Sequence, residues 1–403
     1  MVAGGFRTVL NPTQSLEVTV EFGAAPEDEV FRSEVRAWLD AHATADVDRR
    51  DWERALGAAG WIGIGWAEGG YGNRTATLTQ QVAWAEEYAR SVAPARSGHI
   101  GENLFAPTLI AHGSDEQKAR FLPAVAAGEE LWCQGYSEPG AGSDLAGVRT
   151  VAVREADGYR VSGQKIWTSL AHEADWCFVL ARTEAGSRRH HGLSFLLVPM
   201  DQPGRVEVRP IRQMTGTSEF NEVFFDGAHA RLEHVVGGEG NGWRVAMSLL
   251  GFERGVSTLA QQIGFAQELG RVVRDAVESG AVGDPVVRER LVRQWAELRV
   301  MRWNALRTLG NSATEPGAPS VAKLLWGGWH QRLGELAVLV RGAAASVGPA
   351  GWSAAAPYEL DAAQHLFLFS RADTIYGGSD QVQRTIIAER VLGLPREPKG
   401  VES

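Results

Sequence analysis

Residues 132–145 read Trp-Cys-Gln-Gly-Tyr-Ser-Glu-Pro-Gly-Ala-Gly-Ser-Asp-Leu, and residues 163–169 read Gly-Gln-Lys-Ile-Trp-Thr-Ser. The run from Gly140 to Gly142 carries no bulky side chain, so its backbone N–H groups can approach a polar ring or an anion closely. Trp167 offers a flat apolar wall, and two hydroxyl residues follow it. A planar heterocycle fits between the two segments, and the stretch therefore predicts a cofactor loop.

The chain on either side of this stretch has a helical pattern. Before it, apolar residues recur at three- and four-residue intervals, which predicts amphipathic helices. The first such face is formed by Val30, Phe31, Val35, Trp38 and Leu39. Ser114 and Gln117 form a capping-box pattern, which predicts the start of a helix. Further helices are expected at about 51–59, 77–90, 243–279, 285–312, 320–345, 361–374 and 380–392.

Short strands are expected between these helical regions. They are predicted at 148–155, 159–167, 176–182, 193–199, 206–211 and 222–226, with Asp157-Gly158 as a tight hairpin turn. The predicted fold class is α+β, in the order helix, sheet, helix. The predicted divisions are an N-terminal extension (1–25), an α-helical domain (26–130), a central β domain (131–235) and a C-terminal α-helical bundle (236–403).

Bulk composition excludes several classes of protein. The 403 residues are 44% hydrophobic and 22% charged, which is typical of a globular protein, and the net charge of −9 argues against nucleic acid as a partner. No run of about 18 apolar residues appears, so no membrane span is expected. Residues 1–20 lack the apolar core of a signal peptide. The two cysteines form no disulfide framework and suit a reducing cytoplasm.

His190 and His191 form the one adjacent histidine pair of the sequence. A metal site needs two more converging ligands, so a solvated turn is the favoured interpretation and no metal is predicted.

Four blocks, in order, resemble the acyl-CoA dehydrogenase family. They are the run from Ser137 to Asp144, the segment 163–169, Met-Thr-Gly-x-x-Glu-Phe-Asn-Glu-Val-Phe-Phe at 214–225, and Gln-Val-Gln-Arg at 381–384. The resemblance covers residues 26 to 397 and is greatest to bacterial members. It implies the acyl-CoA dehydrogenase fold, FAD as cofactor, and α,β-dehydrogenation of an acyl thioester to the trans-2-enoyl thioester.

The resemblance also implies which residues bind FAD. They are Gln134, Ser137, Gly142, Ser143, Trp167, Thr168, Ser169, Ser379 and Gln381, and Ser143 is also expected to touch the substrate's pantetheine. Glu138 and Pro139 are expected to shape the loop. The alternatives are a core position for Trp167 and a helix N-cap for Ser379.

The catalytic base departs from the most familiar members of the family, which carry it as the Glu of a Tyr-Glu-Gly-Thr motif. Here that motif is Tyr-Gly-Gly-Ser, with Gly377 in place of the base. A minority of the family carries the Glu after the β domain, just before an Arg, and Glu253 and Arg254 match that pattern. A carboxylate on an apolar helical stripe must be paired, protonated or functional.

Glu253 is therefore predicted to be the general base. The alternative is an ion pair with Arg288 or Arg290. The Gly377 N–H is expected to polarise the thioester carbonyl. By resemblance Arg254 lies near the CoA, although a solvated or ion-paired arginine fits as well.

A second departure concerns the FAD pyrophosphate. The Arg-Phe-Gly and Gln-x-x-Gly-Gly-x-Gly segments of many homotetrameric members are absent here, so another chain is expected to complete the site, or other residues to bind the pyrophosphate. Some bacterial members that act on steroid side-chain thioesters are α₂β₂ assemblies. A homo- or hetero-oligomer, dimer or tetramer, is thus expected.

The predicted substrate is an acyl-CoA or an acyl-carrier-protein thioester, and the predicted electron acceptor is an electron-transfer flavoprotein. Two rival functions stay open. One is a flavin-dependent monooxygenase or oxidase on the same fold, and the other is a non-catalytic partner subunit of a heteromeric dehydrogenase.

Overall fold

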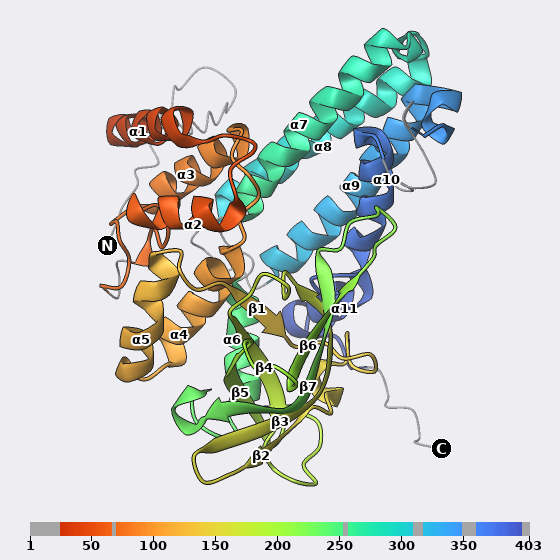
Figure 1. Cartoon of the computed structure of the whole chain (residues 1–403). Coiled ribbons are helices and arrows are strands. Elements are labelled where there is room, and N and C mark those ends of the chain that lie inside the picture. The colour runs from red at the N-terminus through yellow and green to blue at the C-terminus, as the bar shows by residue number, and fades with distance from the viewer. Residues whose placement is uncertain (1–24, 67–69, 253–256, 309–316, 349–359, 397–403) are drawn as a thin grey trace, which may run out of the picture.

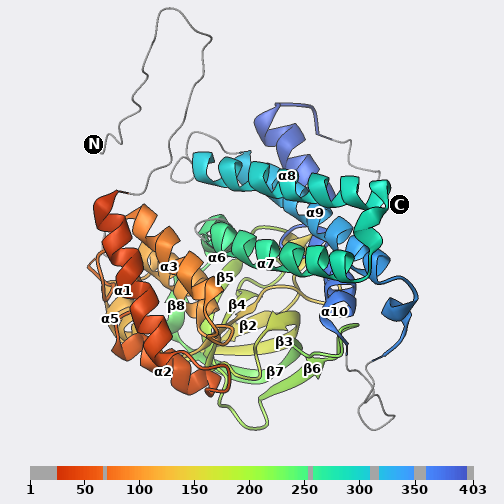
Figure 2. The same cartoon turned by 90° about the horizontal axis from the view of Figure 1, so that it is seen from above.

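The computed structural model describes residues 25–66, 70–252, 257–308, 317–348 and 360–396. Figure 1 shows helices from the first part of the chain on one side, a sheet below, and a tall helical bundle from the last part on the other side. Seen from above, the first helices and the bundle flank the sheet (Figure 2). This layout confirms the expected α+β fold class. No described helix has the length and apolar character needed to cross a membrane.

The N-terminal part consists of helices whose starts follow local chemistry. They are α1 (Pro26–His42), α2 (Arg49–Ala58), α3 (Leu78–Arg90), a π-turn at Gly101–Phe105, α4 (Ala106–His112) and α5 (Asp115–Ala126). The predicted capping box of Ser114 and Gln117 is present at the start of α5. The prediction for Val30 was wrong, because its side chain is 71% exposed. Val30 precedes the buried Val35 by five residues, which is about 140° around the helix.

The central sheet has eight strands in the order β6-β7-β3-β2-β4-β5-β8, and β1 pairs in parallel with β4. The strands are β1 (Trp132–Gly135), β2 (Val151–Arg154), β3 (Gly158–Ser169), β4 (Trp176–Arg182), β5 (Leu193–Pro199), β6 (Val206–Ile211), β7 (Phe220–Arg231) and β8 (Val235–Val236). The predictions for β4, β5 and β6 are confirmed, and β7 is longer than expected.

Strand β1 escaped sequence-based prediction. It is four residues long and nearly all of it is buried, so it has no alternation of apolar and polar residues. Its parallel register with β4 sets Cys133 opposite Cys177, and both thiols are free and buried.

The C-terminal part contains α6 (Gly242–Phe252), α7 (Ser257–Glu278), α8 (Pro285–Thr308), α9 (Ala318–Arg341), α10 (Ala362–Phe369) and α11 (Asp380–Ile386). Helix α10 continues into a 3₁₀ segment at Ser370–Thr374, and α11 continues into a π-turn at Ile387–Val391. The expected helix 361–374 is thus α-helical only to Phe369. The expected helix 243–279 is described as α6 and α7, and residues 253–256 lie outside the described residues.

Two cores explain how these parts hold together. Phe105 of the π-turn stacks on Trp132 of β1 with ring centroids 3.5 Å apart, and Val245 and Leu249 of α6 are fully buried in the same cluster. Helix α6 therefore packs with the sheet. Helices α7 to α10 form a second core around Trp329, which is also fully buried.

Candidate active site

The loop after β1 is a tight turn with an open rim. Glu138 and Ala141 exchange two backbone hydrogen bonds of 3.1 and 3.0 Å. The Ala141 N–H is thereby occupied, whereas those of Gly140 and Gly142 have no acceptor among the described residues. A Cβ atom at either glycine would meet nothing within 4 Å. The two exposed glycines, followed by the exposed Ser143, leave room for a ligand to approach the main chain.

Lys165 and Glu138 tie this loop to β3. Lys165 is fully buried, and its Nζ donates to Glu138 Oε1 at 2.9 Å and to the main-chain oxygens of Tyr136 and Leu180 at 3.0 and 2.8 Å. The carboxylate of Glu138 also accepts from the N–H groups of Arg149 and Thr150 at 2.6 and 2.8 Å. Glu138 thus shapes the loop, as expected from sequence.

The pKa values of this pair reflect their burial. Burial alone would raise the pKa of Glu138, but the Lys165 ammonium and the hydrogen bonds to the carboxylate hold it below its usual range. Complete burial lowers the pKa of Lys165, and Glu138 opposes that shift. The pair was missed from sequence because its members are 27 residues apart, although Lys165 stands inside a predicted strand.

Trp167 stands on a bulge of β3. The pairing of β3 with β7 shifts register between Lys165 and Thr168, and Trp167 has a φ of +60°. Its side chain is 56% exposed and meets Phe220 edge to face, with ring centroids 6.1 Å apart. The alternative of a core tryptophan is therefore excluded. A left-handed backbone at a non-glycine residue is uncommon, and such conformations concentrate at functional sites.

The residues around Trp167 are held in place from both sides. The Ile166 N–H donates to the Ser137 carbonyl at 2.9 Å, which joins the two predicted flavin segments. Asn221 Nδ2 donates to the Thr168 carbonyl at 3.0 Å. The Thr168 hydroxyl is buried and has no partner among the described residues, so it can serve a bound polar ring.

Two further predicted flavin contacts, Gln134 and Ser169, lie on the strands that flank the loop. Gln134 is half-buried on β1 opposite Phe178, and Ser169 is half-buried at the end of β3 opposite Phe220. Among the described residues, neither side chain has a hydrogen bond to the bulge that carries Trp167.

The Tyr376–Ser379 turn presents a bare main chain. Gly377 and Gly378 have φ values of +63° and +82°, and Gln383 Nε2 donates to both of their carbonyls at 3.1 and 3.3 Å. The Gly377 N–H has no acceptor among the described residues. Ser379 caps α11, because its hydroxyl accepts from the Val382 N–H at 3.3 Å, so the N-cap alternative is confirmed.

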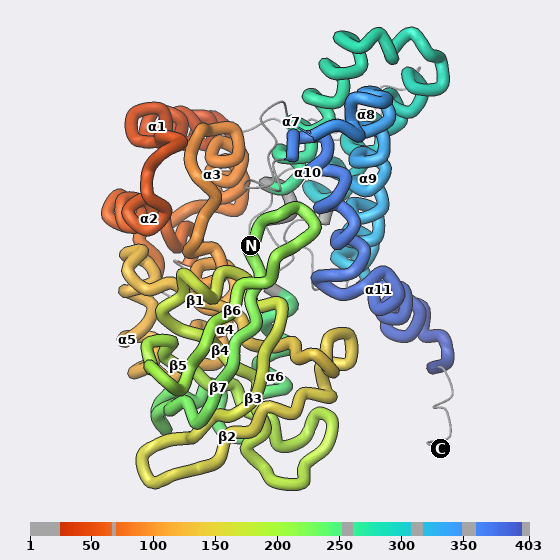
Figure 3. Tube along the Cα trace, turned by 45° about the vertical axis from the view of Figure 1, so that its right-hand side comes forward, coloured from red at the N-terminus to blue at the C-terminus, as the bar shows by residue number. Residues whose placement is uncertain are grey.

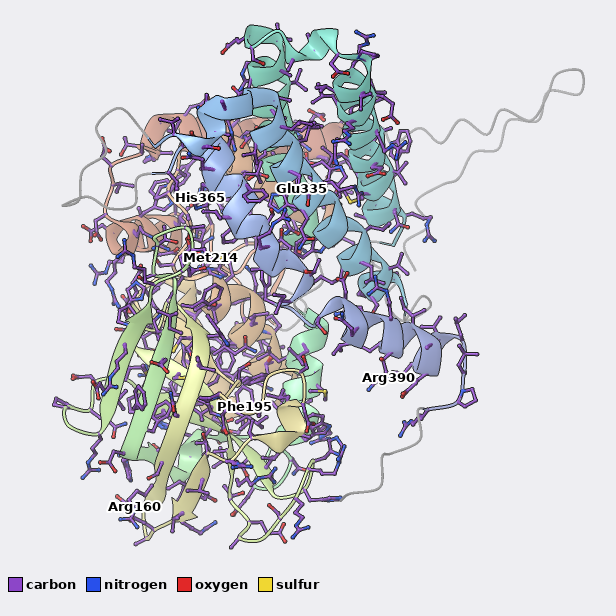
Figure 4. All side chains as sticks on the ribbon, turned by 90° about the vertical axis from the view of Figure 1, so that its right-hand side faces the viewer. Arg160, Phe195, Met214, Glu335, His365 and Arg390 are labelled. Carbon is purple, nitrogen blue, oxygen red and sulfur yellow. The ribbon has the colours of Figure 1, made fainter. Side chains whose placement is uncertain are left out.

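Helix α11 lies at the foot of the bundle, level with the sheet (Figures 1 and 4). Gln381 is exposed on its first turn.

The predicted base and its neighbour lie outside the described residues, because Glu253 and Arg254 fall in the segment 253–256. The ion-pair alternative with Arg288 or Arg290 involves the same undescribed segment and stays a prediction. The preceding helix α6 ends at Phe252 and buries Leu249 against the core it shares with the sheet. The predicted base thus directly follows a helix that packs against the flavin-loop domain.

The histidine pair lies in an exposed turn, which agrees with the favoured interpretation. His190 and His191 are exposed in the turn between β4 and β5, and the His190 ring lies 4.5 Å from that of Trp243. No group of potential ligands suited to a metal occurs in the described part of the chain.

Comparison with known proteins gives the family. Three domain models match in order: acyl-CoA dehydrogenase N-terminal domain at 25–129, middle domain at 133–228 and C-terminal domain at 240–392. The chain belongs to the acyl-CoA dehydrogenase family. It is 53% identical over 390 residues to acyl-CoA dehydrogenase IpdE1 of Mycobacterium tuberculosis, covering 92% of this chain and 99% of the relative.

Solved structures agree with that assignment. A structure named Tcur3481-Tcur3483 steroid ACAD matches with a TM-score of 0.81 and 28% identity, over 94% of this chain and all of the other. The ChsE4-ChsE5 complex from Mycobacterium tuberculosis matches with a TM-score of 0.77 and 29% identity, over 94% of this chain and 100% of that one. This acyl-CoA dehydrogenase is accordingly an oxidoreductase of CH–CH bonds, in a family that is generally FAD-dependent.

The residues of this acyl-CoA dehydrogenase fit a flavin. The exposed Trp167 face, the orphaned Thr168 hydroxyl and the open main chain at Gly140 and Gly142 suit a planar polar ring.

Proposed function

We propose that this acyl-CoA dehydrogenase oxidises the CoA thioester of a steroid-derived acyl group, with Glu253 as the base and FAD bound along the loop 137–143 and Trp167–Ser169. The observation that carries the proposal is the exposed, left-handed Trp167 beside the open glycine loop. The steroid-derived substrate is supported by the 28% identical neighbour, which is named a steroid ACAD.

The chain's own residues define the proposed chemistry. When bound, FAD supplies the hydride acceptor. The glycine loop and Trp167 hold the ring, with Thr168 as a hydrogen-bonding group and Ser379 and Gln381 toward its nucleotide end. Ser143 and Arg254 bind the CoA part of the substrate. Glu253 takes the α-proton, and the Gly377 N–H donates to the carbonyl oxygen as negative charge builds up there. The electrons then leave to an electron-transfer flavoprotein.

Anaerobic flavin bleaching tests this proposal. The purified enzyme, with its partner subunit if one is required, is mixed with steroid-derived, straight-chain and branched acyl-CoA esters. We expect bleaching with the steroid-derived ester and none in Glu253→Gln at unchanged FAD content. Bleaching that persists in Glu253→Gln would reject that residue as the base. Absence of bleaching with every thioester, together with turnover of oxygen and reduced flavin, would favour an oxidase or monooxygenase.

The surface of α8 supports assembly with another chain. Helices α7 and α8 project as a hairpin beyond the rest of the bundle (Figures 1 and 3). Along one arc of α8, Val292, Trp295, Val300 and Trp303 are each more than 50% exposed. Large exposed apolar side chains gathered on one side of a helix, here with the Arg299 guanidinium 5.7 Å from the Trp295 ring centroid, are typical of protein interfaces. We infer that the occupant is a homologous acyl-CoA dehydrogenase chain, because both solved neighbours are named as pairs of chains.

Native mass spectrometry tests this assembly. The chain is expressed alone and with a candidate partner chain, and Trp295→Glu with Trp303→Glu is expected to dissociate the complex. FAD at one per chain in protein purified alone would reject a need for the partner.

A further inference from the structure

A row of buried polar side chains crosses the bundle and ends at the Tyr376–Gly378 turn. His330 of α9 is 4% exposed. Its Nε2 lies 2.8 Å from Oε2 of Glu268 on α7, and its Nδ1 lies 2.5 Å from Oδ2 of Asp373. Asp373 is fully buried, and its Oδ1 accepts from the Tyr376 hydroxyl at 2.6 Å. The row therefore runs from α7 through α9 to the residue that precedes Gly377.

His330 is a cation in this setting. Each ring nitrogen faces a carboxylate oxygen, and an imidazole donates from both nitrogens only when it is protonated. Burial alone would lower the pKa of His330, but the hydrogen bonds to Asp373 and Glu268 raise it to about 9. One positive charge thus lies between two negative ones. The nearby Lys323 Nζ donates to the main-chain oxygen of Asp373.

The turn is held from both ends. On its N-terminal side Tyr376 is tied to Asp373, and on its C-terminal side Gln383 is tied to the carbonyls of Gly377 and Gly378. A Cβ at Gly327 of α9 would lie 3.1 Å from the Asp373 carbonyl, so α9 and this segment are in close contact. With both glycine carbonyls engaged, the Gly377 N–H belongs to a turn whose main-chain oxygens are fixed, and it has no acceptor among the described residues.

We propose that His330 is a positioning residue, which acts through Asp373 and Tyr376 to hold the Gly377 N–H at the thioester carbonyl oxygen. This inference rests on the proposed function, because it takes that N–H as the donor to the carbonyl. A donor that is displaced by about 1 Å loses much of its effect on the developing charge, which can cost about 100-fold in rate. The hydrogen bond from the Gly377 N–H stabilises the transition state more than the bound substrate, so kcat should change more than KM.

Kinetics of Tyr376→Phe and His330→Gln test the proposal in the complete holoenzyme. Tyr376→Phe removes one hydroxyl from a half-exposed side chain, so the fold is not at risk. We expect kcat to fall by about 10- to 100-fold in both variants, while KM changes by less than about 3-fold and FAD content is unchanged. His365→Gln on α10 is the matched control, since its ring stacks on Phe369 and belongs to no such row. It should retain full activity.

Two readouts separate positioning from a structural role. In the double variant the two losses should not add, because both act through Asp373. In the wild type kcat should also fall as pH rises through about 9, and His330→Gln should lack that limb. Glu268 faces His330, and Lys323 and Tyr376 face Asp373, while Arg271 lies 4.0 Å from the other carboxylate oxygen of Glu268.

The outcomes are distinct. An alkaline limb that persists in His330→Gln, additive losses, or a change in KM alone would overturn the positioning role. A wild-type enzyme that no thioester reduces would reject the proposed function instead.

Discussion

Removing one charge from the buried pair that joins the two flavin segments should destabilise the β domain. Glu138→Gln keeps the shape of the side chain but leaves the ammonium of the fully buried Lys165 without a counter-charge. The carboxylate serves three donors, the N–H groups of Arg149 and Thr150 and the Lys165 Nζ, on its two oxygens. An amide has one oxygen, so at least one donor would face an NH₂ group.

The magnitude follows from burial. Breaking a buried ion pair by removing one partner costs about 3–5 kcal/mol. The exposed pair of Glu155 and Arg160 on the same hairpin, 3.3 Å apart, provides the matched control. Its side chains are 42% and 56% exposed, and Glu155→Gln should cost less than about 1 kcal/mol.

Urea unfolding, followed by far-ultraviolet circular dichroism and tryptophan fluorescence, measures these costs. A double-mutant cycle with Lys165→Met gives the coupling between the two charges. We expect the double variant to cost no more than the larger single change, since it leaves no unpaired charge. A cost below about 1 kcal/mol for Glu138→Gln, or two single costs that simply add, would refute the reasoning.

Three other outcomes are expected. Gly377→Glu should not restore flavin bleaching to Glu253→Gln, because the φ of +63° strains any side chain at that position; recovery above about a tenth of the wild-type rate would contradict this. Trp167→Ala should lower FAD retention about 10-fold with little change in unfolding, measured as the ratio of flavin to protein. The pKa of His330 is raised from 6.5 to about 9. Its protonation should therefore add about 3 kcal/mol to the free energy of unfolding below pH 6.5, and this contribution should be lost as pH rises through 9. Urea unfolding at both pH values should show this dependence in the wild type and not in His330→Gln.

Features set by local chemistry were predictable from sequence. The capping box at Ser114 depends on residues three apart, the strands β4 and β5 are short, mainly apolar runs, and β6 begins with alternating apolar and charged residues. Their boundaries could therefore be derived without knowledge of the tertiary structure. The prediction for Val30 failed because its five-residue offset from Val35 turns its side chain about 140° away from the buried face of α1.

Features set by long-range contacts were not predictable. Glu138 and Lys165 are 27 residues apart, and His330 and Asp373 are 43 apart, so neither pairing leaves a local pattern. Lys323 and His330 did leave a trace, since they lie seven residues apart on one face of α9, and the structure buries both. The roles of Glu253 and Arg254 remain predictions that depend on the family pattern.

Cys133 of β1 and Cys177 of β4 face each other, so their reactivity can be used to measure how often these two strands separate. Burial, together with the adjacent Cys177, raises the pKa of Cys133 well above its ordinary value, so Cys133 offers a thiol reagent neither a thiolate nor access while the two strands stay paired, and Cys177 is equally buried. Labelling of the native enzyme therefore requires separation of strands at the root of the glycine loop. The labelling rate therefore measures how often the strands separate, and a ligand bound to the glycine loop should lower that rate.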